Sequence, residues 1–273
     1  MKMSAAYVVY DDIEYLKISV ESIYEQVSKI FFLLNTKPWN GKERPDDRAK
    51  AKFYLESLVK QYPKCEIVEG TWDREFEQRN YGIELSKKND CDFCLIVDTD
   101  EVYHPLEFDN FVHNIVAKNP TVPAFHVSWN TYWKQSPMYQ IEPRESFTPL
   151  ICVNVKQYLF FDKRQGITCD EHGVPTARYA CAYVPPHVLL LHHFSYARTD
   201  EYIKNKMQNF EHSHEIISTW YDDVWLKFKP ENKYLHPTTA NQYMQAVLVN
   251  NNMLPKNIKN FLIEKNENTK LFK

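Results

Sequence analysis

The sequence predicts an α/β fold in which a mostly parallel central sheet is flanked by helices. Short apolar segments alternate with longer amphipathic ones about four times in the first 120 residues, and such alternation is typical of a parallel sheet with helical crossovers. The fourth apolar segment, Phe93–Val97, is apolar at every position, as expected of a central strand that is buried on both faces. After Pro120 the alternation stops, and a second half with shorter strands of mixed direction is expected.

The elements of the first half follow one another in a regular order. The predicted strands are Ala5–Tyr10, Lys29–Leu34, Cys65–Val68 and Phe93–Val97. A helix is predicted after each strand, because apolar residues recur there at helical spacing; the helices cover 13–27, Asp46–Tyr62, Arg74–Lys88 and Pro105–Lys118. The segment Asn35–Arg44 carries proline and glycine and is predicted to be a loop.

The second half is predicted to contain strands and then helices. The expected strands are Ala124–Trp129, Ile151–Val155, Tyr158–Phe161 and His187–Phe194. From Thr199 onward the chain is polar, with helical periodicity that prolines interrupt. We therefore predict one domain over residues 1–200 and a helical C-terminal extension over 201–273.

Composition argues against several functional classes. The 273 residues are 44% hydrophobic and 25% charged, with a formal net charge of −3, which is ordinary for a soluble globular protein and argues against a basic face laid on nucleic acid. The five glycines show neither GxGxxG nor P-loop spacing, so a dinucleotide fingerprint and a Walker NTPase are not expected.

The cysteines and the apolar runs bear on the expected location. The six cysteines are scattered, including a lone Cys91-x-x-Cys94 pair, and are interpreted as reduced core thiols of a cytoplasmic protein. A structural zinc site would need a second pair at suitable spacing. No signal peptide or membrane-spanning segment is predicted, because the longest apolar runs are too short to span a bilayer.

Three carboxylates follow the fourth strand in the segment CDFCLIVDTDEVYHP, which begins at Cys91. Residues i and i+2 of an extended chain point the same way, so Asp98 and Asp100 are expected to converge beyond the strand. The crevice at the carboxyl ends of parallel strands is where such sheets bind ligands. A divalent cation, Mg²⁺ or Mn²⁺, would offset the repulsion between the acids. The alternative is that Thr99 or Asp100 caps the helix that begins near Pro105.

Three segments, taken in order, resemble a family-2-type glycosyltransferase with the GT-A fold, over about the first 200 residues. They are VVYDDIEYLKISVESIY, EQRNYGIELSKKNDCDFCLIVDTDE and LLLHHFSYAR. The resemblance implies a metal-dependent enzyme that transfers a sugar, expected to be a hexose, from a nucleotide-diphosphate sugar such as a UDP-sugar to an acceptor hydroxyl with inversion. It divides residues 1–200 into a nucleotide-sugar-binding half, 1–120, and an acceptor half, 121–200.

The resemblance also implies a role for each acid and histidine of these segments. Asp100 corresponds to the acid that binds the metal directly, and Asp98 to the acid that contacts the ribose, or the metal through water. His193, or else His192, corresponds to a later metal ligand, and an imidazole ligand would favour Mn²⁺ over Mg²⁺. The alternative for the histidines is burial with ordinary hydrogen-bond partners.

Four further residues are implied to bind the donor. Tyr10 and Asp12 lie where the family holds the base and the ribose, and Arg79 and Asn80 lie near the diphosphate or the sugar. Asp12 could instead cap the first helix, and Arg79 and Asn80 could belong to an exposed helix face.

The base that takes the acceptor proton is expected in the segment GITCDEHG, 166–173, where Glu171 is preferred over Asp170; the alternative is a polar surface turn. The aromatic residues Trp129, Tyr132 and Trp133 could stack on sugars or bases, or pack in the core.

Two rival functions remain open. A nucleotidyltransferase has a similar fold and metal, but it usually opens with a glycine-rich basic loop, whereas VVYDDIEYL has neither glycine nor a basic residue. A catalytically degenerate binding or scaffold module would have lost the acids or the histidine. The acceptor could be a saccharide, a cell-envelope glycan, a protein or a hydroxylated nucleobase, so a modified nucleic acid is among the expected partners. The sequence carries no indication of the oligomeric state.

Overall fold

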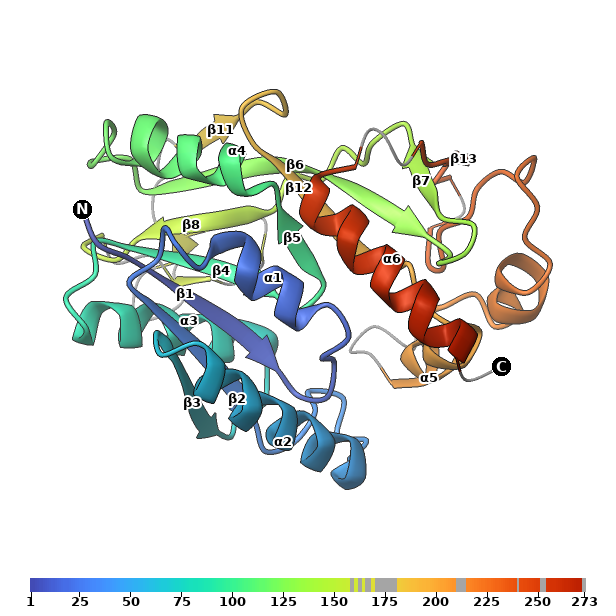
Figure 1. The fold of residues 1–273 in the computed structure, drawn as a ribbon, viewed down its shortest axis with the longest axis horizontal. Coiled ribbons are helices and arrows are strands. Elements are labelled where there is room, and N and C mark those ends of the chain that lie inside the picture. Colours follow the sequence, from blue (N-terminus) through green and yellow to red (C-terminus); the bar gives the residue numbers. More distant parts are fainter. Residues whose placement is uncertain are drawn as a thin grey trace.

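The computed structural model describes residues 1–157, 160–161, 164, 168–169, 181–209, 215–239, 241–250 and 254–271. Its central feature is the predicted parallel sheet (Figure 1). The first four strands are β1 (Met3–Val9), β2 (Lys29–Asn35), β3 (Cys65–Gly70) and β4 (Phe93–Asp98). They pair in the order β4-β1-β2-β3, and every pair is parallel. The predicted α/β fold class is therefore confirmed.

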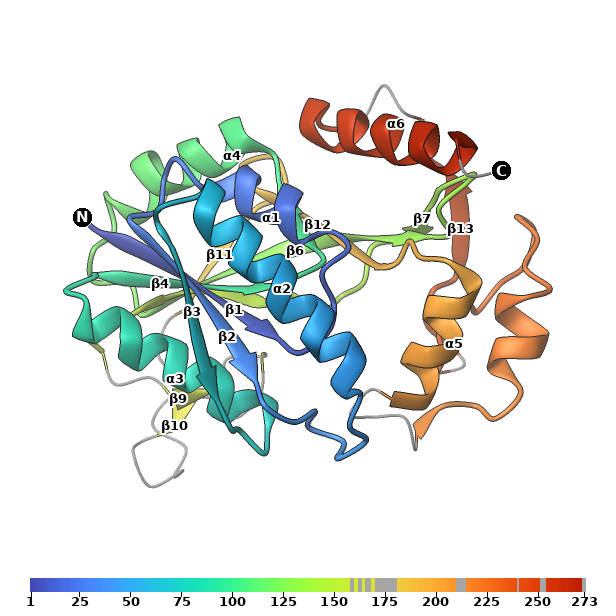
Figure 2. The ribbon, with the colours of Figure 1, turned by 60° about the horizontal axis from the view of Figure 1, so that its bottom comes forward.

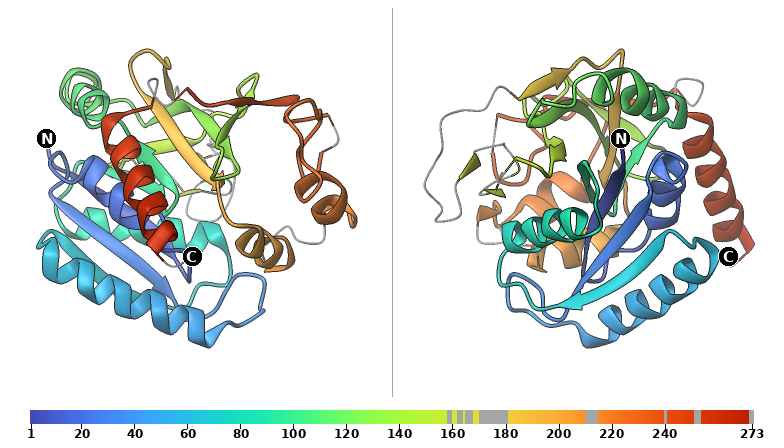
Figure 3. Two further views of the ribbon diagram at one scale, coloured as in Figure 1. Left: turned by 45° about the vertical axis from the view of Figure 1, so that its right-hand side comes forward. Right: turned by 90° about the vertical axis from the view of Figure 1, so that its left-hand side faces the viewer.

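A helix follows each of these strands, as predicted. The helices are α1 (Leu16–Ile23), α2 (Pro45–Gln61), α3 (Glu75–Lys88) and α4 (Pro105–Asn110), and α4 continues as the π-helix η1 (Phe111–Val116). The apolar sides of α1, α2 and α4 pack with Ala5 and Tyr7 on one face of β1. Ile83 of α3 packs with Ala6 on the other face. Figures 2 and 3 show α3 on the side of the sheet opposite α1 and α2.

The second half adds strands of mixed direction, also as predicted. They are β5 (Glu101–Tyr103), β6 (Ala124–Trp133), β7 (Tyr139–Glu142), β8 (Leu150–Asn154), β9 (Phe160–Phe161), β10 (Thr168–Cys169), β11 (Ala182–Val184) and β12 (Leu190–Tyr196). β8 runs antiparallel to both β4 and β6. β12 is parallel to β6 and antiparallel to β5.

The C-terminal extension is not purely helical and packs closely on the rest of the chain. It contains α5 (Asp200–Asn209), η3 (Tyr221–Trp225), the strand β13 (Gln245–Leu248) and α6 (Lys256–Leu271). β13 pairs with β7 and joins the main sheet. The first turn of α6 packs through Ile258 against Tyr15 and Ile18, and Figure 1 shows α6 beside α1. None of the helices in the described part of the chain combines the length and hydropathy that a bilayer crossing requires.

Candidate active site

A cavity of about 860 Å³ opens at the carboxyl ends of β1, β2 and β4. The chain moves outward from β1 to β2 and β3, and then returns to the other side of β1 to form β4. Open α/β sheets usually bind ligands in the crevice beyond the strand ends at such a reversal of strand order. The loops after β1 and β2 form one wall, and the first turns of α3 form another. The end of β12 and helix α5 complete the enclosure.

Asp98, the last residue of β4, lines this cavity and is held by two arginines. Its Oδ1 accepts a hydrogen bond from Arg79 Nη2 at 2.8 Å, and its Oδ2 accepts one from Arg164 Nη1 at 2.6 Å. Burial opposes ionisation of Asp98, but the charges of Arg164 and Arg79 outweigh it and hold the pKa at about 2. Asp98 is therefore a fixed, ionised acceptor at neutral pH.

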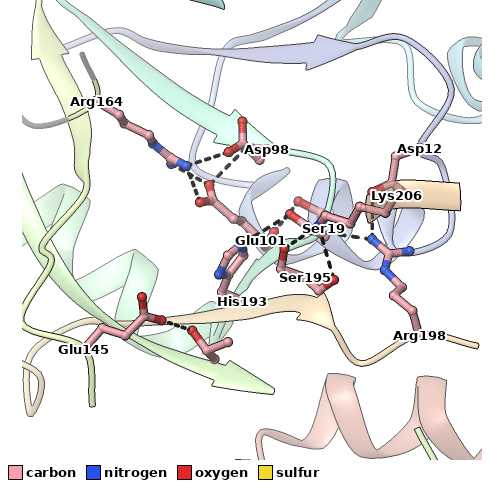
Figure 4. A network of polar contacts seen from close by, with 12 residues as sticks. Asp12, Ser19, Asp98, Glu101, Glu145, Arg164, His193, Ser195, Arg198 and Lys206 are labelled. Carbon is pink, nitrogen blue, oxygen red and sulfur yellow. Dashed lines mark hydrogen bonds and ion pairs between the residues drawn. The ribbon is translucent and has the colours of Figure 1, made fainter. Parts of the chain in front are cut away.

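Glu101, the third carboxylate of the segment, is fully buried and forms a two-bond pair with Arg164 (Figure 4). Arg164 Nη1 donates to Glu101 Oε1 at 2.5 Å and Nη2 donates to Oε2 at 2.7 Å. The backbone N–H of Asp98 also donates to Glu101 Oε2, at 3.0 Å. In this structure the repulsion between these neighbouring acids is thus offset by arginines.

Asp100, in the turn between β4 and β5, and His193 of β12 come together at the same cavity. His193 Nε2 lies 3.8 Å from Asp100 Oδ1, and both residues line the cavity. The ring of Trp129 stacks on the imidazole with the ring centroids 4.3 Å apart. Burial lowers the pKa of His193 to about 4, so the imidazole is neutral at pH 7 and has a lone pair available.

These two residues fit a divalent cation, which would take an oxygen from Asp100 and a nitrogen from His193. His193 Nδ1 has no hydrogen-bond partner in the described part of the chain. The proton of the neutral imidazole can therefore sit on Nδ1, which leaves the lone pair of Nε2 for a metal. Within the described ranges, no group of three His, Cys, Asp or Glu side chains is arranged to hold a metal. The predicted metal therefore stays a prediction, with two protein ligands.

His192 is placed differently from its neighbour. Its side chain is buried, its Nδ1 lies 2.7 Å from the hydroxyl oxygen of Tyr132, and it does not line the cavity. The alternative of an ordinarily paired buried histidine therefore applies to His192, and the geometry favours His193 for the ligand role.

Asp12 lines the cavity and is bound by the buried Arg198. Arg198 Nη2 donates to Asp12 Oδ2 at 2.7 Å and lies 3.5 Å from Asp100 Oδ2, while its Nη1 donates to Glu14 Oε2 at 2.7 Å. Helix α1 begins at Leu16 with no side-chain cap, so the helix-cap alternative for Asp12 is wrong. Arg198 links the loop after β1 to Asp100.

Tyr10 belongs to a polar and aromatic wall near the end of β1. The guanidinium of Arg44 lies 5.1 Å from the centroid of the Tyr10 ring, and the backbone N–H of Arg44 donates to the Tyr10 hydroxyl at 2.8 Å. Arg44 also pairs with Asp11 at 2.5 Å. Trp39 lines the same cavity, and its Nε1 donates to Gln78 Oε1 at 3.0 Å.

The remaining predicted residues divide between the cavity and other places. Arg79 is 3% exposed and lines the cavity, so the exposed-helix alternative is wrong. Asn80 is half-buried and is not among the lining residues. Of the three aromatic residues, only Trp129 lines the cavity, whereas Trp133 packs with Trp220 and Trp225.

The base candidates Asp170 and Glu171 lie outside the described residues, so their role stays a prediction. Cys91 and Cys94 are free buried thiols, as predicted.

Sequence reasoning missed five cations of the cavity, namely Arg44, Lys50, Arg164, Arg198 and Lys206. Arg198 stands at the end of the quoted segment LLLHHFSYAR, two residues after Tyr196, and was the one detectable signal. The others are contributed by distant segments and no local pattern marks them.

Comparison with known proteins finds no family for the chain and only weak similarity to the solved structures named below. No protein-family model matches the chain, and no curated protein matches it. A 4-diphosphocytidyl-2C-methyl-D-erythritol synthase from Anaerococcus prevotii DSM 20548 is 10% identical with a TM-score of 0.43, over 75% of this chain and 93% of that chain. A CMP:2-keto-3-deoxy-manno-octonic acid synthetase complexed with CTP is 10% identical with a TM-score of 0.34, over 57% of this chain and 75% of that chain.

At these values the comparisons assign no function to the chain. The resemblance to family-2-type glycosyltransferases stays a prediction, whereas the Rossmann-like architecture rests on the observed strand order.

Proposed function

We propose that this protein is a divalent-cation-dependent transferase that moves a sugar from a nucleotide-diphosphate donor to an acceptor hydroxyl. The observation that carries the proposal is the convergence of Asp98, Asp100 and His193 on one cavity at the carboxyl ends of the parallel strands. Its volume of about 860 Å³ lies within the range of sites that enclose small organic ligands.

Each residue has a role in this proposal. Asp100 and His193 would hold the cation, which supplies positive charge to a diphosphate leaving group. Asp98, immobilised by Arg79 and Arg164, accepts hydrogen bonds from hydroxyl groups of the donor. Tyr10 and Asp12 contact the base and the ribose from the loop after β1.

Sugar transfer also requires a proton acceptor. The acceptor oxygen forms a bond to the anomeric carbon as the bond from that carbon to the diphosphate oxygen breaks, and the acceptor proton passes to a carboxylate. Glu171, then Asp170, remain the proposed bases. A saccharide, a cell-envelope glycan, a protein and a hydroxylated nucleobase are the proposed acceptors.

Nucleotidyl transfer is the second candidate, and the cationic side chains of the cavity are the observation in its favour, although seven carboxylates line the same cavity. Six of its described lining residues are cationic, which suits a triphosphate; they are Arg44, Lys50, Arg79, Arg164, Arg198 and Lys206. The loop after β1 opposes this candidate, because Asp11 and Asp12 stand where a triphosphate-binding loop is usually basic. We therefore place sugar transfer first.

Thermal unfolding with a panel of nucleotides tests the proposal. Nucleotide-diphosphate sugars and nucleoside triphosphates, CTP included, are each added with and without Mn²⁺, and a ligand that binds the folded state raises Tm. We expect a Mn²⁺-dependent rise with one nucleotide-diphosphate sugar, which Asp100→Asn abolishes. Asp223→Asn, at an exposed site on η3, is the matched control and should retain the rise.

The product distinguishes the two candidates. Release of a nucleoside diphosphate from the bound donor supports sugar transfer. Release of pyrophosphate from a nucleoside triphosphate would establish nucleotidyl transfer instead. No Tm shift with any nucleotide would exclude both.

A further inference from the structure

We infer that Lys206, together with Ser195, binds the sugar-linked phosphate of the donor, which becomes the terminal phosphate of the nucleoside diphosphate that leaves. This inference rests on the proposed function and assigns a residue of the C-terminal extension to it. Lys206 is half-buried on α5 and lines the cavity. Its Nζ donates to Ser195 Oγ at 2.5 Å and lies 3.2 Å from the backbone oxygen of Ser195.

Lys206 differs from the other cations of the cavity in its partners. Each of the others lies within ion-pair distance of a carboxylate: Arg44 and Asp11 at 2.5 Å, Lys50 and Asp47 at 3.0 Å, Arg79 and Asp98 at 2.8 Å, Arg164 and Glu101 at 2.5 Å, Arg198 and Asp12 at 2.7 Å. Among the described residues, no carboxylate lies within ion-pair distance of the Lys206 ammonium, and its hydrogen-bond partners are the two neutral oxygens of Ser195.

The arrangement leaves two neighbouring donors for a ligand, one N–H of Lys206 and the hydroxyl of Ser195. An ammonium group has three N–H donors, and Ser195 accounts for two of them. Because the Ser195 oxygen accepts from Lys206, its own hydroxyl proton is available to a ligand. A charged donor beside a neutral hydroxyl at a cavity wall suits a phosphate oxygen, and hydrogen bonds between ions are the stronger kind.

The position relative to the proposed cation site identifies which phosphate this is. Ser195 follows His193 by two residues in β12, and the side chains of both line the cavity. Figure 4 shows Lys206, Ser195 and Arg198 close to one another near His193. An anion held by Lys206 would therefore lie beside a cation held by Asp100 and His193. In a nucleotide-diphosphate donor, the sugar-linked phosphate gains negative charge during transfer. The metal cation and the Lys206 ammonium would together stabilise that charge.

Isothermal titration with Mn²⁺ present tests the inference, using UDP, the other nucleoside diphosphates, the matching nucleoside monophosphates and inorganic pyrophosphate. We expect Lys206→Met to weaken binding of the preferred nucleoside diphosphate about 10- to 100-fold. Binding of the nucleoside monophosphate should change little. Lys206→Arg should recover part of the lost affinity. Lys204→Met, which removes a cation on the exposed side of the same helix, should bind as the wild type does.

The outcomes separate this inference from the proposed function. If the wild type and Lys206→Met bind a nucleoside diphosphate with equal affinity, the inference is overturned and the proposed function stands. Lys206-dependent binding of pyrophosphate without binding of any nucleoside diphosphate supports an anion site at Lys206 and overturns the proposed function. If the wild type binds none of these anions, both fail. Thermal unfolding of each variant verifies that it is folded.

Discussion

At the scale of single residues, the acids after β4 are stabilised by guanidinium groups that come from far along the chain. Arg164 contacts Asp98 and Glu101 from more than 60 residues away, and Arg79 reaches Asp98 from α3. Glu101 and the two guanidinium groups are almost fully out of water, where removal of one partner leaves the other costly to bury. The acids can be recognised within one sequence segment, whereas the arginines come close to them only in the folded structure.

Replacement of Arg164 by methionine should destabilise the protein by about 3–5 kcal/mol, because the buried Glu101 then loses its charged partner. Urea-induced unfolding measures the change. The double variant Arg164→Met, Glu101→Gln should recover part of the loss, since no unpaired charge stays buried. Lys227→Met breaks an exposed pair with Asp223 and should leave the urea midpoint unchanged. An unchanged midpoint for Arg164→Met itself would show that the buried pair contributes no stability.

His236 should make stability depend on pH. Its Nδ1 accepts hydrogen bonds from the backbone N–H groups of Thr238 and Thr239, at 3.2 and 3.1 Å, and burial lowers its pKa to about 4. The unfolded chain has an ordinary histidine pKa of about 6.5, so between these values the unfolded state binds more protons. The contribution of His236 is fully present above pH 6.5 and is lost as the pH falls toward 4.

Urea unfolding of the wild type and His236→Asn from pH 7.5 to 4 measures this contribution. Asparagine keeps an acceptor oxygen and does not titrate, so the stability difference between the proteins should move in favour of the variant as the pH falls. Parallel pH profiles for the two proteins would contradict the assignment.

At the scale of elements, the parallel half was predictable and part of the mixed half was not. Strands such as β4 and helices such as α2 carry their own hydrophobic periodicity over enough residues to be recognised. β5, β7 and β13 have only three or four residues, and each is a strand because a distant partner pairs with it. β12 pairs with both β6 and β5, and this pairing places His193 at the cavity. It likewise depends on tertiary contacts and not on local sequence.

Close packing of α3 on β1 depends on Gly82. A methyl group at Gly82 would lie 2.5 Å from the Ala6 side chain, so Gly82→Ala should destabilise the protein by about 1–3 kcal/mol, despite the better helix propensity of alanine. Thermal or urea unfolding measures the change. The pair Ala6→Gly, Gly82→Ala moves the methyl group to the helix and should restore part of the stability. A stabilised single variant would mean that the helix shifts without cost.

At the scale of the whole molecule, the predicted boundary near residue 200 divides a single cavity. Residues from both sides of that boundary line it, including Asp100 and Lys206. The extension also supplies β13 to the sheet and lays α6 on α1. From sequence alone, a polar tail with helical periodicity is predicted to be a separate extension, because the surfaces on which it packs belong to segments far away in the chain. The extension is an integral part of the fold and of the candidate site.

Ile258 should therefore matter as much as a residue of the central core. It is fully buried at the start of α6 with Tyr15 and Ile18 of the N-terminal region, and Tyr15 contacts Arg198 through its ring, 4.5 Å from the guanidinium carbon. We expect Ile258→Ala to cost about 2–5 kcal/mol of unfolding free energy, in one transition with the rest of the molecule. Ile263→Ala, on the same helix but with 55% of the residue exposed, should cost little.

Urea unfolding followed by both far-UV circular dichroism and tryptophan fluorescence measures these effects. Coincident, shifted transitions for Ile258→Ala indicate one cooperative unit, whereas a separate early transition with an unshifted main one would show that α6 unfolds independently of the sheet that carries Asp98 and Asp100.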